Sequence, residues 1–140
     1  KIYKKYFKLL SCGYTEIDLQ NAIDLGPILF VMASIFHGAH FINTKRLKIK
    51  ESNRINDLAL ELNKFGINVE EYDNEVIIKK QELQKPTEIL TGHNDHRIVM
   101  SLSVLLTLTG GYIKDEDAVK KSYPRFFEDL KQIGIEVRQC

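Results

Sequence analysis

The spacing of hydrophobic residues along the chain predicts alternating helices and strands. Residues 52–65 have the clearest helical pattern, because apolar positions recur every three or four residues and Gly66 follows as a cap. Residues 67–72 and 75–79, separated by Asp73-Asn74, predict a β-hairpin. Residues 1–10 fit either a helix or a strand. The other predicted elements are helices over 28–36, 94–108 and 124–133, and strands over 14–19, 39–43, 87–90, 112–113 and 135–138.

These predicted elements form a weak internal repeat. Each copy has an aspartate, an apolar helix, a glycine, a short strand, a basic residue, a second helix and an apolar-Gly-Ile turn into a strand. Asp24 and Lys50 belong to the first copy, and Asp95 and Lys121 to the second. The duplication predicts supersecondary units that complete each other's core. Helices packed on sheets with uniform crossovers would open their N-termini on one side.

The composition narrows the class of protein. The chain has 140 residues, of which 44% are hydrophobic and 28% charged, which is typical of about one globular domain. The net charge of +1 argues against a general attraction to nucleic acid or to an anionic membrane. The longest apolar run, residues 27–36, is shorter than the roughly 20 residues that span a bilayer. Cys12 and Cys140 are expected to be free thiols in a reducing compartment, the cytoplasm.

The strongest functional signal is the stretch Lys50-Glu51-Ser52-Asn53-Arg54. It lies where a helix is predicted to begin, and Lys50 and Arg54 would share a face of that helix. Free N–H groups and the positive end of the helix dipole favour an anion there. Bases at a helix start oppose the stabilising order, which points to function. Glu51 adds a possible acid or base, although the neighbouring cations favour its ionised form.

Further charged residues fall at other predicted helix starts, namely Asp24, His96, Arg97 and Lys121. Together with the Lys50–Arg54 stretch they predict a surface for a ligand with carboxylate and phosphate groups. Asp24 and Glu51 come from different segments and would form the acid–base pair.

Simpler interpretations stay open for the same residues. Asp24 and Asp95 can each be an ordinary helix N-cap, with His96 on the surface. The Lys50–Arg54 stretch can be a solvated helix end. The remaining histidines, His37, His40 and His93, lack the spacing of metal ligands, so no metal site is predicted.

Three segments together resemble one family. Residues 46–54 (RLKIKESNR) are similar to its R-L-R-x-K-E-S-D-R segment, residues 94–100 (NDHRIVM) to N-D-H-R-x-A-M, and residues 121–127 (KSYPRFF) to K-S/T-Y/F-P-x-F-F/Y. Their order and approximate spacing also agree. The chain therefore resembles the 3-phosphoshikimate 1-carboxyvinyltransferases, or enolpyruvylshikimate-phosphate synthases, over residues 14–137. Asn53 replaces the usual Asp, and Val99 the usual Ala.

The resemblance implies an α/β (α+β) fold of repeated β-α-β-α-β-β units, with helices packed on mixed sheets in an inside-out αβ-barrel-like domain. Members of the family are much longer and have two domains. Residues 1–140 would be a single, incomplete C-terminal domain of about two units, the second near residues 87–138. The Lys-Ser pair, the Gly-rich segment and the Ser-Ser-Gln segment of the N-terminal domain do not occur here. The isolated chain is expected to be inactive, since half a site cannot orient two substrates.

The resemblance also implies a reaction. The 5-hydroxyl of shikimate 3-phosphate adds to phosphoenolpyruvate, phosphate leaves, and neither a metal nor an organic cofactor takes part. The expected partners are these two substrates and the N-terminal domain, with no nucleic acid and no membrane. The resemblance implies that Asp24 removes the proton of the hydroxyl and that Glu51 protonates the methylene carbon. It also implies that phosphoenolpyruvate is bound by Arg54, Arg97 and Lys121, and shikimate 3-phosphate by Lys50. Arg46 falls where some members have a substrate-binding Asn.

Two other functions stay open. The UDP-N-acetylglucosamine enolpyruvyl transferases share the architecture, but the K-E-S-N-R and D-H-R segments argue against them. The other is a non-catalytic module, in which the repeat is a scaffold and the basic helix ends bind phosphate or other anions.

Overall fold

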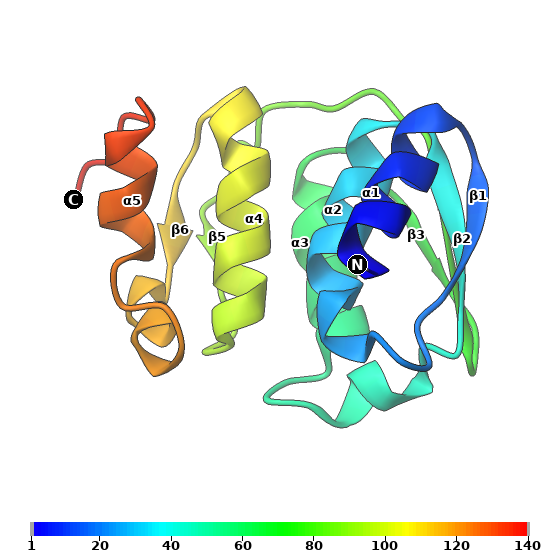
Figure 1. The fold of residues 1–140 in the computed structure, drawn as a ribbon. Helices are drawn as coiled ribbons and strands as arrows, with labels where there is room; N and C mark the ends of the chain where they lie inside the picture. The colour runs from blue at the N-terminus through cyan, green and yellow to red at the C-terminus, as the bar shows by residue number, and fades with distance from the viewer. Residues whose placement is uncertain (1, 140) are drawn as a thin grey trace.

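The computed structural model describes residues 2–139. Helices and strands alternate along most of the chain (Figure 1). The α-helices are α1 (Ile2–Cys12), α2 (Gly26–Ile35), α3 (Arg54–Lys64), α4 (His96–Thr109) and α5 (Phe126–Gln132). The strands are β1 (Thr15–Asp18), β2 (Gly38–Ile42), β3 (Val69–Glu71), β4 (Glu75–Lys79), β5 (Leu90–Thr91) and β6 (Ile113–Lys114). Three 3-10 helices, η1 (Ile23–Leu25), η2 (Lys45–Ile49) and η3 (Glu116–Lys121), lie between them.

The larger sheet has the strand order β1-β2-β4-β3. β1 and β2 are parallel and are connected through α2, whereas β2 pairs with β4, and β4 with β3, in antiparallel fashion. The run β1-α2-β2-α3-β3-β4 has the order of the β-α-β-α-β-β unit that the resemblance implies. The hairpin β3–β4 is confirmed, with Glu71 opposite Val76.

One face of this sheet is covered by helices (Figure 1). Alternate strand residues point into that layer and are buried, among them Ile17, Phe41 and Val76. Phe41 packs on Phe30 of α2 with ring centroids 4.7 Å apart. The parallel β1–β2 pair is thereby tied to the helix that connects its two strands.

The amphipathic pattern of residues 52–65 is confirmed as α3, with a later start than predicted. Asn53 is the N-cap, and its side chain accepts a hydrogen bond from the Asn56 N–H at 3.1 Å. Gly66 follows the helix with φ of +83°, a conformation that favours glycine. The N–H groups of Gly66 and Ile67 then bond to carbonyls of the last turn and end the helix. Lys50 therefore lies before the helix, not on its face.

α4 joins the two parts of the chain. Its residues Ile98, Leu102 and Leu105 belong to the same hydrophobic core as α1, α2, α3 and the larger sheet. On another side, Val99 forms a small second cluster with Ala118 and Val119 of η3. In Figure 1, α4 stands between the helices over the larger sheet and the pair β5–β6, with α5 beyond that pair.

The second run of elements, β5-α4-β6-η3-α5, is less buried. β5 and β6 pair in parallel with only two residues each, and α5 has no buried residue. The predicted strand at 135–138 is wrong, because those residues have no strand partner among residues 2–139. In the first run, the corresponding strand is β3, which pairs with β4 alone. Among the described residues, no strand equivalent to β4 follows residues 135–138.

Other predicted boundaries shift by a few residues. Residues 2–12 are helical, which settles the segment that fitted either structure. The predicted strand at 87–90 is observed at Leu90–Thr91, and the helix predicted from Pro124 begins at Phe126. The 3-10 helices were not predicted, since their apolar residues are too few to show a period.

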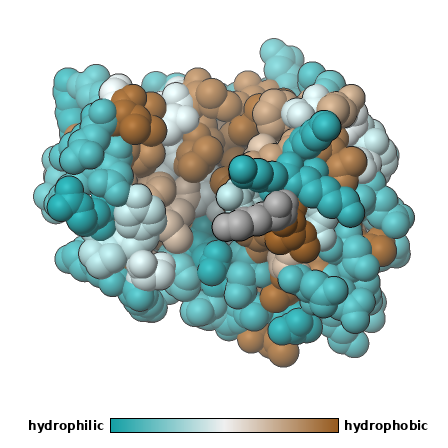
Figure 2. Space-filling view, in the orientation of Figure 1, coloured by the Kyte–Doolittle hydropathy of each residue, from teal (hydrophilic) through white to brown (hydrophobic). Residues whose placement is uncertain are grey.

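Hydrophobic side chains also reach the surface. Figure 2 shows them gathered over the middle of one face, above α4 and the helices beside it, with polar residues around the edge. Leu108 and Ile133 are 60% and 75% exposed. Across residues 2–139, every helix is too short or too polar to cross a membrane.

Candidate active site

A buried ion pair lies at the centre of the candidate site. Arg54, the first residue of α3, donates from Nε to Asp95 Oδ2 at 2.8 Å and from NH2 to Asp95 Oδ1 at 3.2 Å. The side chains of Arg54 and Asp95 are 1% and 0% exposed. Ser52 donates to the same Asp95 oxygen at 2.8 Å. The start of α3 is thus fastened to the start of α4.

Burial by itself would raise the pKa of Asp95, but hydrogen bonds from Arg54 and Ser52 and the charge of Arg54 hold that pKa below its usual value. Asp95 is also the N-cap of α4 and accepts from the Arg97 N–H at 3.0 Å. The capping interpretation of Asp95 is therefore correct, and it accounts for only part of the interactions of this carboxylate.

Asp24 lies in η1, just before α2, with a half-exposed side chain. Its Oδ1 is 3.2 Å from Arg54 NH1 and 3.4 Å from Lys50 Nζ. Partial burial opposes ionisation, but the hydrogen bond and charge of Lys50, with the charges of Arg97 and Arg54, lower the pKa of Asp24. The N-cap of α2 is Leu25, so the interpretation of Asp24 as a helix cap is wrong.

Glu51 lies between η2 and α3, and its Oε2 pairs with Arg54 NH2 at 2.5 Å. Its side chain is 44% exposed, so it is partly open to solvent. Arg54 therefore contacts three carboxylates, those of Asp24, Glu51 and Asp95. All of its nitrogens are engaged, whereas the sequence predicts a guanidinium that presents its fork to a ligand.

Arg97 reaches across from α4, where its NH1 donates to the backbone carbonyl of Asp24 at 3.1 Å. That contact leaves other guanidinium N–H groups for a ligand. The neighbouring His96 is 9% exposed and its Nδ1 is buried without a hydrogen-bond partner among the described residues. The alternative interpretation of His96 as a surface residue is therefore wrong.

Lys121 is the last residue of η3, so its placement at a helix start is wrong. Its side chain is exposed and donates from Nζ to the carbonyl of Asn94 at 3.2 Å, next to Asp95. Arg46 lies in η2, is exposed, and makes no hydrogen bond or ion pair with any residue that the structure describes.

The structure thus brings together the predicted site residues other than Arg46, although they come from distant parts of the chain. Three cations, Lys50, Arg97 and Lys121, reach the surface around the buried pair. Such a cluster can bind a carboxylate or phosphate and hold an ionised Asp24 beside it. Within residues 2–139, no group of three or more His, Cys, Asp or Glu side chains could hold a metal ion.

Two residues have roles that the sequence pattern does not reveal. Ser52 and Asp95 are here the partners that orient Arg54. Asp95 and Arg54 are 41 positions apart, so spacing within one helix carries no sign of their contact. A signal did exist in the weak repeat, which sets an aspartate before the first helix of each copy.

Comparison with known proteins shows the family to which the chain is similar. The family model of EPSP synthase (3-phosphoshikimate 1-carboxyvinyltransferase) matches residues 4–130. The chain is 42% identical over 123 residues to the 3-phosphoshikimate 1-carboxyvinyltransferase of Clostridium perfringens, covering 86% of this chain and 29% of that protein. The enzyme of that name from Clostridium acetobutylicum is 40% identical over 126 residues, with 88% and 29% covered.

A solved structure agrees as well. The EPSP synthase of Acinetobacter baumannii superimposes with a TM-score of 0.76 at 30% identity, covering 86% of this chain and 30% of that one. The chain therefore spans about a third or less of the length of these relatives. Because the family model covers nearly the whole chain and the fold agrees, the chain belongs to the family of EPSP synthases, the 3-phosphoshikimate 1-carboxyvinyltransferases.

Proposed function

We propose that this chain is part of an enzyme that transfers the enolpyruvyl group of phosphoenolpyruvate to the 5-hydroxyl of shikimate 3-phosphate and releases phosphate. This step belongs to the shikimate pathway of aromatic amino acid biosynthesis. One observation carries the proposal: Asp24, Lys50 and Arg97 converge on the buried Arg54–Asp95 pair. The family to which the chain belongs supports the choice of substrates.

In this proposal the cations hold the phosphoenolpyruvate. Arg97 and Lys121 bind its carboxylate and phosphate, because their remaining N–H groups are open to the site. Lys50 binds shikimate 3-phosphate. Arg54 keeps the three carboxylates apart and in place, and it contacts phosphoenolpyruvate only if its bond to Asp24 or Glu51 is exchanged for one to the ligand.

The two carboxylates act on the protons. Asp24, whose pKa is lowered, is ionised at neutral pH and accepts the proton of the attacking hydroxyl. Glu51 is paired with Arg54 as a carboxylate, so it must first leave Arg54 and take up a proton from solvent, an exchange that is coupled to substrate binding. It then gives this proton to the methylene carbon as the carbon–oxygen bond forms. In the elimination that follows, Glu51 takes a proton back from the methyl carbon, and phosphate leaves with the proton that Asp24 had accepted.

We further propose that residues 1–140 belong to an incomplete C-terminal domain, with the opposite wall of the cleft supplied by an N-terminal domain. The short β5–β6 pair and the exposed α5 support this, because both leave apolar surface uncovered. The reaction would take place in the cytoplasm, where Cys12, an exposed free thiol, stays reduced.

Titration of the chain with phosphoenolpyruvate, followed by backbone NMR, tests the site. Arg97→Ala is expected to weaken binding by at least about tenfold, the usual cost of a hydrogen bond to a charged group. Arg125→Ala is the matched control, because the Arg125 side chain is exposed and, among residues 2–139, its guanidinium forms ion pairs with Glu128 and Asp129 of α5 and with no residue of the site. Equal binding of all polyanions, insensitive to Arg97→Ala, would instead identify a non-catalytic anion-binding module.

A further inference from the structure

The loop between β5 and α4, residues 92–95, ends in Asp95 and leads to Arg97 of the candidate site. Its two central residues, His93 and Asn94, have φ of +51° and +54°, in the left-handed region that residues other than glycine rarely adopt. Such a backbone persists only where surrounding contacts fix it. The contacts that hold the β5–α4 loop therefore also determine where Asp95 and Arg97 lie.

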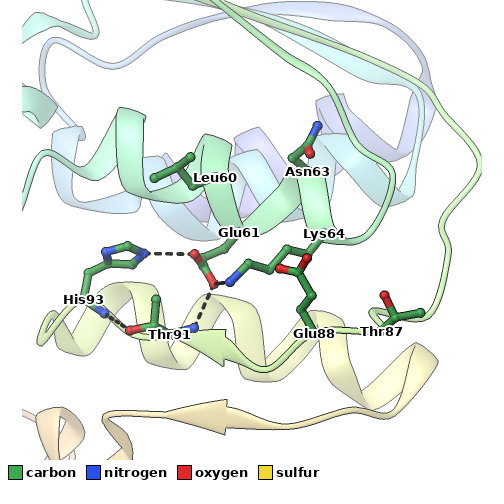
Figure 3. Close-up of a pocket in the computed structure, with 8 residues that line it drawn as sticks. All are labelled: Leu60, Glu61, Asn63, Lys64, Thr87, Glu88, Thr91 and His93. Atoms are coloured by element: carbon green, nitrogen blue, oxygen red, sulfur yellow. Dashed lines mark hydrogen bonds and ion pairs between the residues drawn. The ribbon is translucent and has the colours of Figure 1, made fainter.

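One side of the β5–α4 loop is held by Glu61 of α3. The Glu61 carboxylate is buried, accepts from the Thr91 N–H at 2.7 Å and pairs with Lys64 Nζ at 2.9 Å. Its other oxygen lies 3.0 Å from His93 Nε2. Figure 3 shows these three groups converging on Glu61. The end of β5 and the start of the loop are thereby fastened to α3.

The opposite side of the loop is held by Asp115, the residue that follows β6. Its Oδ2 accepts from the Thr91 hydroxyl at 3.0 Å and from the Asn94 N–H at 3.2 Å. The same Thr91 hydroxyl accepts from the His93 N–H at 3.2 Å. The N–H groups of both left-handed residues therefore lead to the Asp115 carboxylate, directly from Asn94 and through the Thr91 hydroxyl from His93.

Asp115 occupies the position of a helix cap but does not act as one. It is the N-cap of η3, where an aspartate ordinarily accepts from the first N–H groups of the helix, yet its side chain makes no such bond. Its own φ is +65°. Among residues 2–139, the carboxylate bonds to Thr91 and Asn94 and forms no ion pair. The side chain therefore serves the β5–α4 loop and not its own helix.

The two ends of η3 hold Asn94 between them. Asp115 precedes η3 and accepts from the Asn94 N–H, whereas Lys121 ends η3 and donates to the Asn94 carbonyl at 3.2 Å. Both backbone polar groups of this left-handed residue are therefore bonded to one short segment. Lys121, a cation of the candidate site, lies in the same arrangement.

We propose that Asp115 is a positioning residue of the candidate site: its carboxylate fixes the left-handed backbone of the β5–α4 loop and so sets the positions of Asp95 and Arg97. Without this acceptor the loop can relax, and the Asp95 carboxylate then moves away from Arg54. The consequence for anion binding rests on the proposed function, whereas the positioning of Asp95 does not.

Two substitutions separate the hydrogen bonds of Asp115 from its charge. Asp115→Asn removes the charge but keeps an oxygen acceptor, and asparagine enters the left-handed region more readily than most residues. Asp115→Gly removes both charge and acceptor, and glycine adopts a φ of +65° without strain. Both variants are expected to fold, since Asp115 is exposed. The readout is the pKa of Asp95, measured by NMR from its carboxyl carbon shift against pH.

Against the effect of burial, hydrogen bonds from Arg54 and Ser52 hold the pKa of Asp95 below its usual value. Asp115→Gly is expected to raise this pKa, because a displaced Asp95 loses part of that hydrogen bonding. Loss of a negative charge by itself acts in the opposite direction, since it favours an ionised Asp95. Asp115→Asn is therefore expected to leave the pKa unchanged or to lower it. A rise in both variants, or in neither, would overturn the proposal.

Thr91→Val separates loss of the hydrogen bonds from the added flexibility of a glycine. It removes the hydroxyl that joins the His93 N–H to Asp115, with no change in charge and little change in side-chain shape. The pKa of Asp95 is expected to rise, by less than in Asp115→Gly, because the bond from the Asn94 N–H remains. No rise in Thr91→Val would attribute the glycine effect to backbone flexibility and overturn the proposal.

The affinity for phosphoenolpyruvate tests the consequence for the site. Asp115→Gly is expected to bind it about fivefold more weakly than Asp115→Asn, the lower end of typical coupling between sites. The two variants have the same charge, so their difference reports the acceptor. Equal affinities would overturn the link from the loop to anion binding and leave the proposed anion site standing. The expected pKa changes without phosphoenolpyruvate binding by any form of the chain would support the positioning role and count against the proposed function.

Discussion

Arg54 and Asp95 form a bidentate ion pair that is almost completely enclosed by protein, at 2.8 and 3.2 Å between the paired atoms. Two opposite charges that are shielded from solvent stabilise each other, and removal of one leaves the other buried without a partner. The pair joins the N-termini of α3 and α4, the two helices that carry Arg54 and Arg97. The same contact therefore contributes to the stability of the fold and to the geometry of the site.

Asp95→Ala is expected to destabilise the chain by about 3 kcal/mol, the lower end for removing one partner of a buried pair. The lower end applies because Arg54 keeps its contacts with Asp24 and Glu51. The free energy of unfolding in urea measures the effect. Asp117→Ala removes an exposed partner of Lys120 and should change stability by less than about 1 kcal/mol. Similar losses in the two variants would contradict a structural role for the buried pair.

The lowered pKa of Asp95 predicts how stability depends on pH. A carboxyl whose pKa is lower in the folded than in the unfolded chain contributes stability above its unfolded value of about 4. That contribution is lost as the pH falls from about 4 through the lower folded pKa. Urea unfolding between about pH 2 and 6 should therefore show a stability gap between wild type and Asp95→Asn that narrows in acid. A gap that stays constant over this range would rule out the linkage.

Lys50→Ala is expected to raise the pKa of Asp24 toward its usual value, because Lys50 supplies both a hydrogen bond and a charge to that carboxyl. Stability should change little, since the pair is partly exposed. The carboxyl carbon shift of Asp24, followed by NMR against pH, measures the pKa. Lys45→Ala removes an exposed lysine that pairs with Asp73 and is the control. An unchanged midpoint in Lys50→Ala would mean that Arg54 and Arg97 alone hold the carboxylate.

The sequence predicted the elements that have long apolar periods and the residues that carry charge. α3, α4 and the β3–β4 hairpin all follow from periodicity and turn residues. The position of Lys121 was misjudged because it ends a 3-10 helix, which is too short for a period to appear. The site residues were identified through the resemblance and the helix-start argument, but their mutual contacts were not.

Contacts between side chains depend on tertiary packing, which periodicity does not specify. The side chain of Arg54 lies at a helix start, where it would be exposed if α4, with Asp95, did not pack beside α3. The segment 135–138 shows the same dependence for a strand: its sequence is suitable, but a strand forms only beside a partner. In both cases, the sequence pattern does not reveal which neighbouring element packs against the segment.

Leu102→Ala is expected to cost about 2–5 kcal/mol of unfolding free energy, as for other fully buried leucines. Leu102 lies on the side of α4 that belongs to the main core, so its loss leaves a cavity between α4 and the helices over the larger sheet. Leu108 on the same helix is 60% exposed, and Leu108→Ala should change stability by less than about 0.5 kcal/mol. Urea unfolding compares the two under identical conditions. If Leu102→Ala lowered the free energy of unfolding as little as Leu108→Ala, α4 would not be part of the cooperative core. The Arg54–Asp95 pair would then have to hold the two parts of the chain together without the packing of α4.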